Sequence, residues 1–171
     1  MFYNGSDTLE EVRRCLPDRN PAALPGTDLQ SCHGATTRAT LAASDYQEGY
    51  RHFLCGMAQG CDLYFCEAVL ALRERYPEVT VEAAIPCPTQ ADAWPEAERD
   101  RYRELVARCD METMVSDTYS SACMQRRDRY MVDHAMLLIA AFDGTAGGTR
   151  YTVEYALRRG IEIFDVSIPT E

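Results

Sequence analysis

Along most of the chain after residue 50, short apolar runs alternate with longer segments whose apolar positions recur at helical spacing. This alternation is typical of a parallel sheet covered by helices on both faces. We expect strands at residues 51–55, 79–85, 112–116, 136–142 and 161–168. We expect helices at residues 61–76, 94–109, 124–134 and 149–159. The pattern therefore predicts an α/β fold.

Residues 1–45 break this pattern. Prolines and glycines interrupt any long element, a short helix is suggested only at residues 9–16, and no apolar strand is evident. A doubly wound sheet normally has its first strand in this part of the chain. We therefore expect residues 1–45 to be an atypical part of the fold.

Composition narrows the class of protein. The chain has 171 residues, 46% of them hydrophobic, which suits one domain with a single core over residues 1–171. Its 17 Lys and Arg against 27 Asp and Glu give a formal net charge of −10, which repels polyanions, so nucleic acid is an unlikely partner. No apolar run reaches the roughly 18 residues of a membrane-spanning helix. We expect no membrane partner.

The eight cysteines lack the Cys-x-x-Cys spacing and the histidine cluster of a metal site. No basic and then apolar signal segment starts the sequence. We therefore expect reduced thiols that act as small buried hydrophobic side chains, no bound metal and a cytoplasmic location.

Two glycine-containing turns follow expected strands and precede expected helices, at residues 56–62 and 144–149. Glycine lets a backbone approach a ligand closely, and the free N–H groups of a helix N-terminus attract phosphate. Because both turns lie at carboxyl ends of parallel strands, we favour ligand binding over two plain tight turns. The ligand-binding residues that these turns suggest are Gly56, Met57, Ala58, Gly60, Asp62, Gly147, Gly148 and Thr149.

Two acidic residues in this region have alternative interpretations. Asp62 either caps the following helix or accepts a hydrogen bond from a ribose hydroxyl. Glu67 lies in an apolar helix, where an unpaired carboxylate is costly to bury, so it reaches the rim or pairs with an arginine. For Glu67 we favour the structural pairing.

Arg126, Arg127 and Arg129 stand near the start of an expected helix, where the helix dipole disfavours positive charge. A bound anion would compensate for that placement, because the guanidinium group matches phosphate or carboxylate. Pairing with the protein's own carboxylates is an equally good explanation. Arg126 and Arg129, three residues apart on one helix face, are the candidate anion clamp.

Four segments in order resemble a bacterial family of uncharacterised proteins, the YpsA-like family. They are residues 55–62, 84–90, 126–134 and 143–156, and the resemblance runs from about residue 49 to residue 169. This family belongs to the SLOG superfamily, which also contains the DNA-processing protein A and the LOG phosphoribohydrolases. The resemblance implies a Rossmann-like fold with a nucleotide-derived ligand, such as an ADP-ribose-like molecule, at the turns. It also implies a homo-oligomer, most simply a dimer.

Three positions depart from the patterns of these relatives. Their usual first turn, Gly-His-Arg-Pro, is matched here only by residues 17–21, without the glycine and histidine. Asp128 stands where the family's Arg-Asn-Arg has asparagine, and an acid there should weaken anion binding. Thr152 occupies the position of the LOG enzymes' glutamate, and Glu154 points to another helix face.

Three functions remain open on the sequence. The first is a sensor or regulatory domain that binds a phosphate-bearing, nucleotide-derived ligand with little or no catalysis. The second is a phosphoribohydrolase-type enzyme that cleaves an N-glycosidic bond, with Glu67 or Glu154 as a weak candidate for the acid-base group. The third, which the net charge disfavours, is a DNA-binding protein that uses the three arginines.

Overall fold

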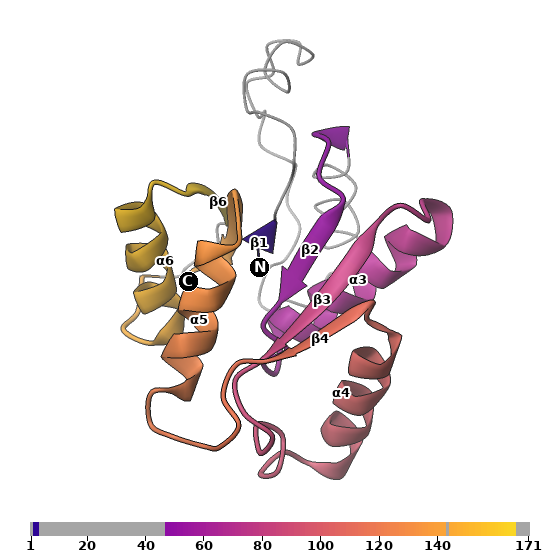
Figure 1. The fold of residues 1–171 in the computed structure, drawn as a ribbon, viewed down its shortest axis with the longest axis vertical. Helices are drawn as coiled ribbons and strands as arrows, with labels where there is room; N and C mark the ends of the chain where they lie inside the picture. Colours follow the sequence, from indigo (N-terminus) through magenta and orange to yellow (C-terminus); the bar gives the residue numbers. More distant parts are fainter. Residues whose placement is uncertain (1, 4–46, 143, 167–171) are drawn as a thin grey trace, which may run out of the picture.

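The computed structural model describes residues 2–3, 47–142 and 144–166, which form a sheet with helices on both faces (Figure 1). The sheet has six strands in the order β4-β3-β2-β1-β5-β6. The strands are β1 (Phe2–Tyr3), β2 (His52–Cys55), β3 (Thr80–Ile85), β4 (Met111–Met114), β5 (Leu137–Ala141) and β6 (Glu162–Val166). The helices are α3 (Cys61–Arg75), α4 (Glu96–Arg108), α5 (Cys123–Asp133) and α6 (Gly148–Arg159).

The strand pairing is mainly parallel, which confirms the predicted Rossmann-like α/β class. Strand β3 pairs in parallel with β2 and β4, and β5 pairs in parallel with β6. Strand β1 pairs antiparallel with both β2 and β5. The expectation of no strand in residues 1–45 is therefore wrong at Phe2–Tyr3, because two residues are too short to show a periodic pattern. The helix expected at residues 9–16 and the departure at residues 17–21 lie outside the described residues.

Successive side chains along a strand pack into two separate apolar cores, one on each face of the sheet. Phe53 on β2 packs on the side of α3 and α4, in a core with Leu63, Val69 and Leu105. Leu54, the next residue, points to the opposite face, in a core that includes Met131 of α5. This period-2 alternation is what a sheet covered on both faces requires. The protein is thus a three-layer α/β/α sandwich.

The order of the strands creates a switch point between β2 and β5. From β2 the chain proceeds to β3 and β4 on one side, and from β5 it proceeds to β6 on the other. The segments that leave the carboxyl ends of β2 and β5 therefore diverge toward opposite faces of the sheet. Such a divergence leaves a crevice in which ligands of open α/β sheets commonly bind.

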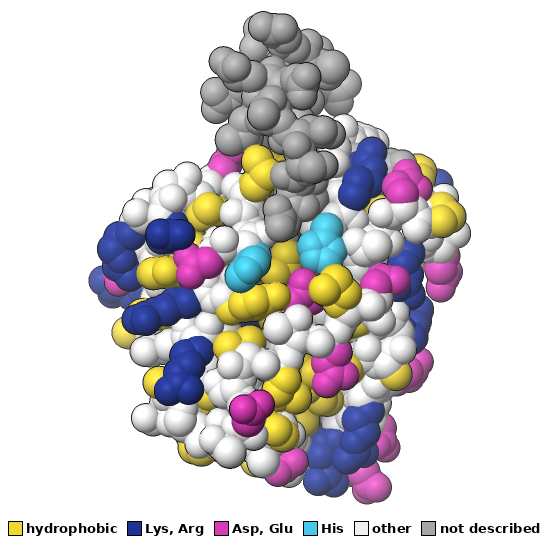
Figure 2. Space-filling model, viewed as in Figure 1, with side chains coloured by type: hydrophobic (Ala, Val, Ile, Leu, Met, Phe, Trp, Pro, Cys, Tyr) yellow, Lys and Arg dark blue, Asp and Glu magenta, His cyan; other side chains and the backbone are white. Residues whose placement is uncertain are grey.

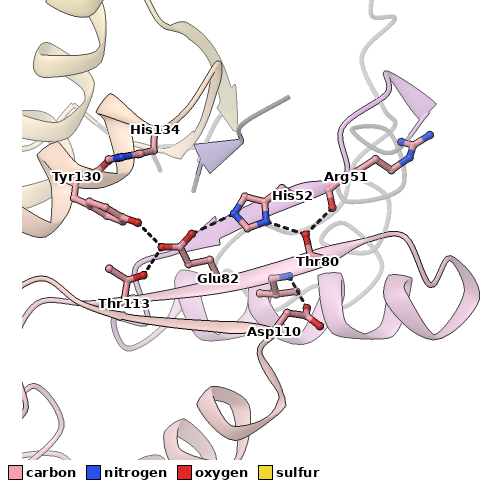
Figure 3. A network of polar contacts seen from close by, with 9 residues as sticks. Arg51, His52, Thr80, Glu82, Asp110, Thr113, Tyr130 and His134 are labelled. Atoms are coloured by element: carbon pink, nitrogen blue, oxygen red, sulfur yellow. Dashed lines mark hydrogen bonds and ion pairs between the residues drawn. The ribbon is translucent and has the colours of Figure 1, made fainter. Parts of the chain in front are cut away.

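A buried carboxylate on β3, Glu82, ties three strands to α5 (Figure 3). Glu82 is 4% exposed and accepts hydrogen bonds from the Thr113 hydroxyl at 2.7 Å and the Tyr130 hydroxyl at 2.6 Å. Its other oxygen lies 3.2 Å from Nε2 of His52, whose Nδ1 lies 2.8 Å from the Thr80 hydroxyl. The hydrogen bond with His52, followed by those with Tyr130 and Thr113, lowers the pKa of Glu82 to about 2 despite burial. The ionised Glu82 carboxylate thus links α5 to the sheet through its hydrogen bond with Tyr130.

The cysteines that the structure describes lie largely in the packed interior. Cys55, Cys66, Cys87 and Cys123 are buried free thiols, and Cys109 is a half-buried one. Cys61 is disulfide-bonded, so the prediction of reduced thiols throughout is wrong at that position. Within residues 2–3, 47–142 and 144–166, no helix is long and apolar enough to cross a membrane. Figure 2 shows acidic and basic side chains interspersed with hydrophobic ones on the face viewed.

Candidate functional site

A cavity of about 470 Å³ lies at the switch point, where α3 and α6 begin. Residues 138–141 of β5 line it, and Met124, Met131 and Val153 contribute apolar lining from α5 and α6. Its polar lining comes from Gln59, Asp62, Arg127, Asp128, Thr149 and Thr152. Helix N-termini, apolar walls and a few polar side chains are the usual components of a small-molecule site.

The first glycine turn is built around Arg127. The carbonyl oxygen of Gly56 accepts a hydrogen bond from Nη1 of Arg127. A Cβ atom on Gly56 would come too close to that nitrogen and would lie 2.8 Å from Oδ2 of Asp62, so both side chains would have to shift to admit a larger residue. In the structure, the group that approaches the Gly56 backbone closely is thus an internal arginine.

Some of the other residues of this turn line the cavity, and others only shape the turn. Ala58 lines the cavity, whereas Gly56, Met57 and Gly60 do not. Met57 is fully buried, and its carbonyl oxygen accepts a hydrogen bond from the Gln90 side chain. Gly60 has φ +85°, a conformation in which any L side chain is strained. A substitution of Gly60 therefore could not separate ligand binding from folding.

Asp62 closes the first turn without capping α3. The N-cap position of α3 is held by Gly60, and Asp62 is the second residue of the helix, so Asp62 is not its capping residue. Instead, Oδ2 of Asp62 accepts a hydrogen bond from the Ala58 N–H at 3.2 Å and lies 3.9 Å from Nη1 of Arg127. This carboxylate holds the turn against the arginine and still borders the cavity.

Arg127 and Asp128 form a buried ion pair in the cavity wall. Nε of Arg127 donates to Oδ1 of Asp128 at 2.8 Å, and both residues are 8% exposed. Burial raises the pKa of the Asp128 carboxyl; Arg127 and a hydrogen bond with Thr152 oppose this, and the Asp62 charge reinforces it. The polar centre of the cavity is thus one guanidinium group between two carboxylates.

The second glycine turn leaves a helix N-terminus open to the cavity. Gly148 begins α6 and lines the cavity together with Thr149, while Gly147 precedes the helix. Among the described residues, no side chain caps α6, and the first turn of the helix has no acidic residue. A Cβ atom on Gly148 would meet nothing within 4 Å. The positive end of the α6 dipole therefore lies at the cavity, where Gly148 leaves room for a ligand.

The structure does not bring Arg126 or Arg129 to the cavity lining. Both are exposed: Nη1 of Arg126 donates to the Ser116 hydroxyl at 3.4 Å, and Nε of Arg129 donates to the Tyr151 hydroxyl at 2.5 Å. The Arg129 guanidinium also lies over the rings of Tyr151 and Tyr155. It is Arg127, between them in sequence, that reaches the site.

The two glutamates proposed for catalysis also lie outside the lining. Glu67 accepts two hydrogen bonds from Arg101, at 2.7 and 2.9 Å, which is the arginine pairing favoured on the sequence. Glu154 pairs with Arg150 at 2.9 Å on the exposed face of α6. Of the carboxylates that the structure describes, Asp62 and Asp128 border the cavity.

A helical signal for the buried arginine was present in the sequence. Cys123, Arg127 and Met131 follow one another at intervals of four, and all three are buried. An arginine that shares the apolar stripe of a helix must find a partner in the interior. That signal distinguishes Arg127 from its two exposed neighbours.

Comparisons with known proteins agree with this architecture. A family model, YpsA, described as the YspA SLOG family, matches residues 38–163. Among curated relatives, the uncharacterised SPbeta prophage-derived protein YoqJ of Bacillus subtilis is 28% identical over 122 residues, 64% of this chain and 71% of that protein. The UPF0398 protein YpsA of Bacillus subtilis is 24% identical over 115 residues, 66% of this chain and 64% of that protein.

A solved structure, DNA processing protein A from Streptococcus pneumoniae, matches with a TM-score of 0.57 at 18% sequence identity. The match covers 85% of this chain and 49% of that chain, so it spans about half the length of the larger protein. A likeness at this identity supports the fold and carries no function with it.

Proposed function

The chain belongs to the YspA SLOG family, and from that premise we propose that its cavity binds a phosphate-bearing ligand derived from a nucleotide. The observation that carries the proposal is the uncapped N-terminus of α6, which opens at Gly148 into a cavity at the switch point of the sheet. Backbone N–H groups and a helix dipole at such a place form an anion site without any basic side chain.

The remaining lining suits the other parts of such a ligand. The phosphate would accept hydrogen bonds from the N–H groups at Gly148 and Thr149. Asp62, which lines the cavity at the end of the first glycine turn, would accept a hydrogen bond from a ribose hydroxyl. The apolar walls from Met131 and Val153 would contact the ribose or the base.

We favour a sensor or regulatory role over the phosphoribohydrolase alternative. Glu67 and Glu154, the residues on which that alternative rested, are each paired with an arginine outside the cavity. The homodimer and the cytoplasmic location expected from the sequence stay predictions.

The Gly148→Val variant is expected to lose at least about tenfold in affinity for ADP-ribose or AMP, because the added side chain occupies the space before the helix N–H groups. Since a Cβ atom there meets nothing in the ligand-free protein, its thermal stability should match that of the parent. Calorimetric titration and thermal melts measure the two quantities.

The matched control is Ala146→Val, which enlarges an exposed residue of the same loop outside the cavity lining. It should bind as the parent does. Equal affinity in the parent and in Gly148→Val would remove the α6 N-terminus from the site, and no binding of either nucleotide to the parent would contradict the proposed function.

A further inference from the structure

The charges at the centre of the cavity do not balance. Within residues 47–142 and 144–166, two carboxylates, those of Asp62 and Asp128, lie against a single guanidinium group, that of Arg127. The other contact of Arg127 is the carbonyl oxygen of Gly56, which also carries partial negative charge. With both carboxylates ionised, this centre carries one more negative than positive charge, which opposes the entry of an anion.

Asp128 is also close to the proposed phosphate position. Asp128 and Thr152 of α6 line the same cavity, and the Thr152 hydroxyl donates to the carbonyl oxygen of Gly148 at 3.0 Å. Asp128 is thus one side chain away from the first turn of α6. An anion bound at that turn would lie beside a carboxylate whose side chain is only 11% exposed.

We propose that the anionic ligand enters this cavity together with a proton, which Asp128 takes up. This inference rests on the proposed function. Protonation removes the charge that would repel the ligand, and it converts Asp128 into an O–H donor that can bond a phosphate oxygen. Asp128 takes the proton because it is more buried than Asp62, whose side chain is 24% exposed.

The groups that face Asp128 come from three helices. Arg127 of α5 and Thr152 of α6 favour the ionised carboxylate, whereas Asp62 of α3 and the burial of the site favour the protonated form. The bound ligand adds a second negative neighbour to this balance. Asp128 therefore determines how strongly affinity for an anion depends on pH.

ADP-ribose is the suitable probe, because its phosphates carry no group that titrates near neutral pH. Calorimetric titration in two buffers of different ionisation enthalpy should show net uptake of up to one proton per ligand at about pH 6. Affinity should fall as the pH rises toward about 8, by at most about tenfold per pH unit. A ligand with a phosphate monoester would be a poorer probe, because the monoester itself titrates near pH 6 and would contribute to the measured proton uptake.

The Asp128→Asn variant should bind ADP-ribose without proton uptake, and about tenfold more tightly than the parent at about pH 8. Asp133→Asn on the same helix, whose carboxylate contacts Tyr155 and Arg159 outside the cavity, should behave as the parent does.

An NMR titration of the side-chain carboxyl carbon of Asp128 in the parent, with and without ADP-ribose, shows directly whether Asp128 takes up the proton. Uptake that persists in Asp128→Asn, or binding without uptake in the parent, would overturn this inference alone. Absence of ADP-ribose binding at both pH values would overturn the proposed function with it.

Discussion

The Arg127→Met variant is expected to lose about 3 kcal/mol or more of its free energy of unfolding. The substitution keeps much of the side-chain volume but leaves the buried carboxylate of Asp128 without its partner at 2.8 Å. It also removes the donor to the Gly56 carbonyl and the cation that lies beside Asp62. Urea denaturation at neutral pH measures the loss.

Arg126→Met, one residue earlier on the same helix, is the matched control. Arg126 is exposed, and its contact with Ser116 is long at 3.4 Å, so its replacement should change stability by no more than about 0.5 kcal/mol. Similar losses in the two variants would contradict the buried position of Arg127.

A second large effect is expected on replacing Glu82, the carboxylate that joins the sheet to α5. Its pKa is lowered from 4.5 to about 2 in the folded protein, so it contributes stability that is fully present above about pH 4.5. That contribution, about 3 kcal/mol, is lost as the pH falls through 2. The Glu82→Gln variant should therefore be less stable by about this amount at neutral pH, and its stability should depend less steeply on pH between 4.5 and 2.

Urea melts over this pH range test the expectation against a control on the neighbouring strand. Glu112→Gln alters an exposed carboxylate of β4 and should follow the parent. A Glu82→Gln variant that keeps the parent's pH dependence would show that the network contributes nothing to stability.

The alternation of apolar runs was enough to predict the fold after residue 50. The expected strand at residues 136–142 became β5, Leu137–Ala141, and the expected helix at residues 61–76 became α3, Cys61–Arg75. These predictions succeed because burial on both faces of a sheet imposes its own apolar pattern on each strand and helix. The Phe2–Tyr3 strand escaped prediction because its place is set by pairing with β2 and β5 and not by any local pattern.

The site was only partly predictable, because its centre depends on pairs far apart in the chain. Both glycine turns border the cavity, through Ala58 in the first and Gly148 in the second. Gly56 is in contact with Arg127, 71 residues later, and the residues around Gly56 in the sequence do not indicate that contact. Likewise, the sequence indicated an arginine partner for Glu67 but could not identify Arg101. Long-range side-chain pairing, not secondary structure, limits such predictions.

Mapping of ADP-ribose onto the backbone amides of the parent protein by NMR tests the central proposal most directly. If the cavity is the binding site, saturable shifts should concentrate at residues 58–62, after β2, and at residues 148–152, in the first turns of α6. The backbone amides of Arg129 and Tyr155 should be unaffected, because these two residues lie outside the cavity lining. Saturable shifts confined to that outer surface, or no saturable shift at all, would contradict the proposal that this cavity binds a nucleotide-derived ligand.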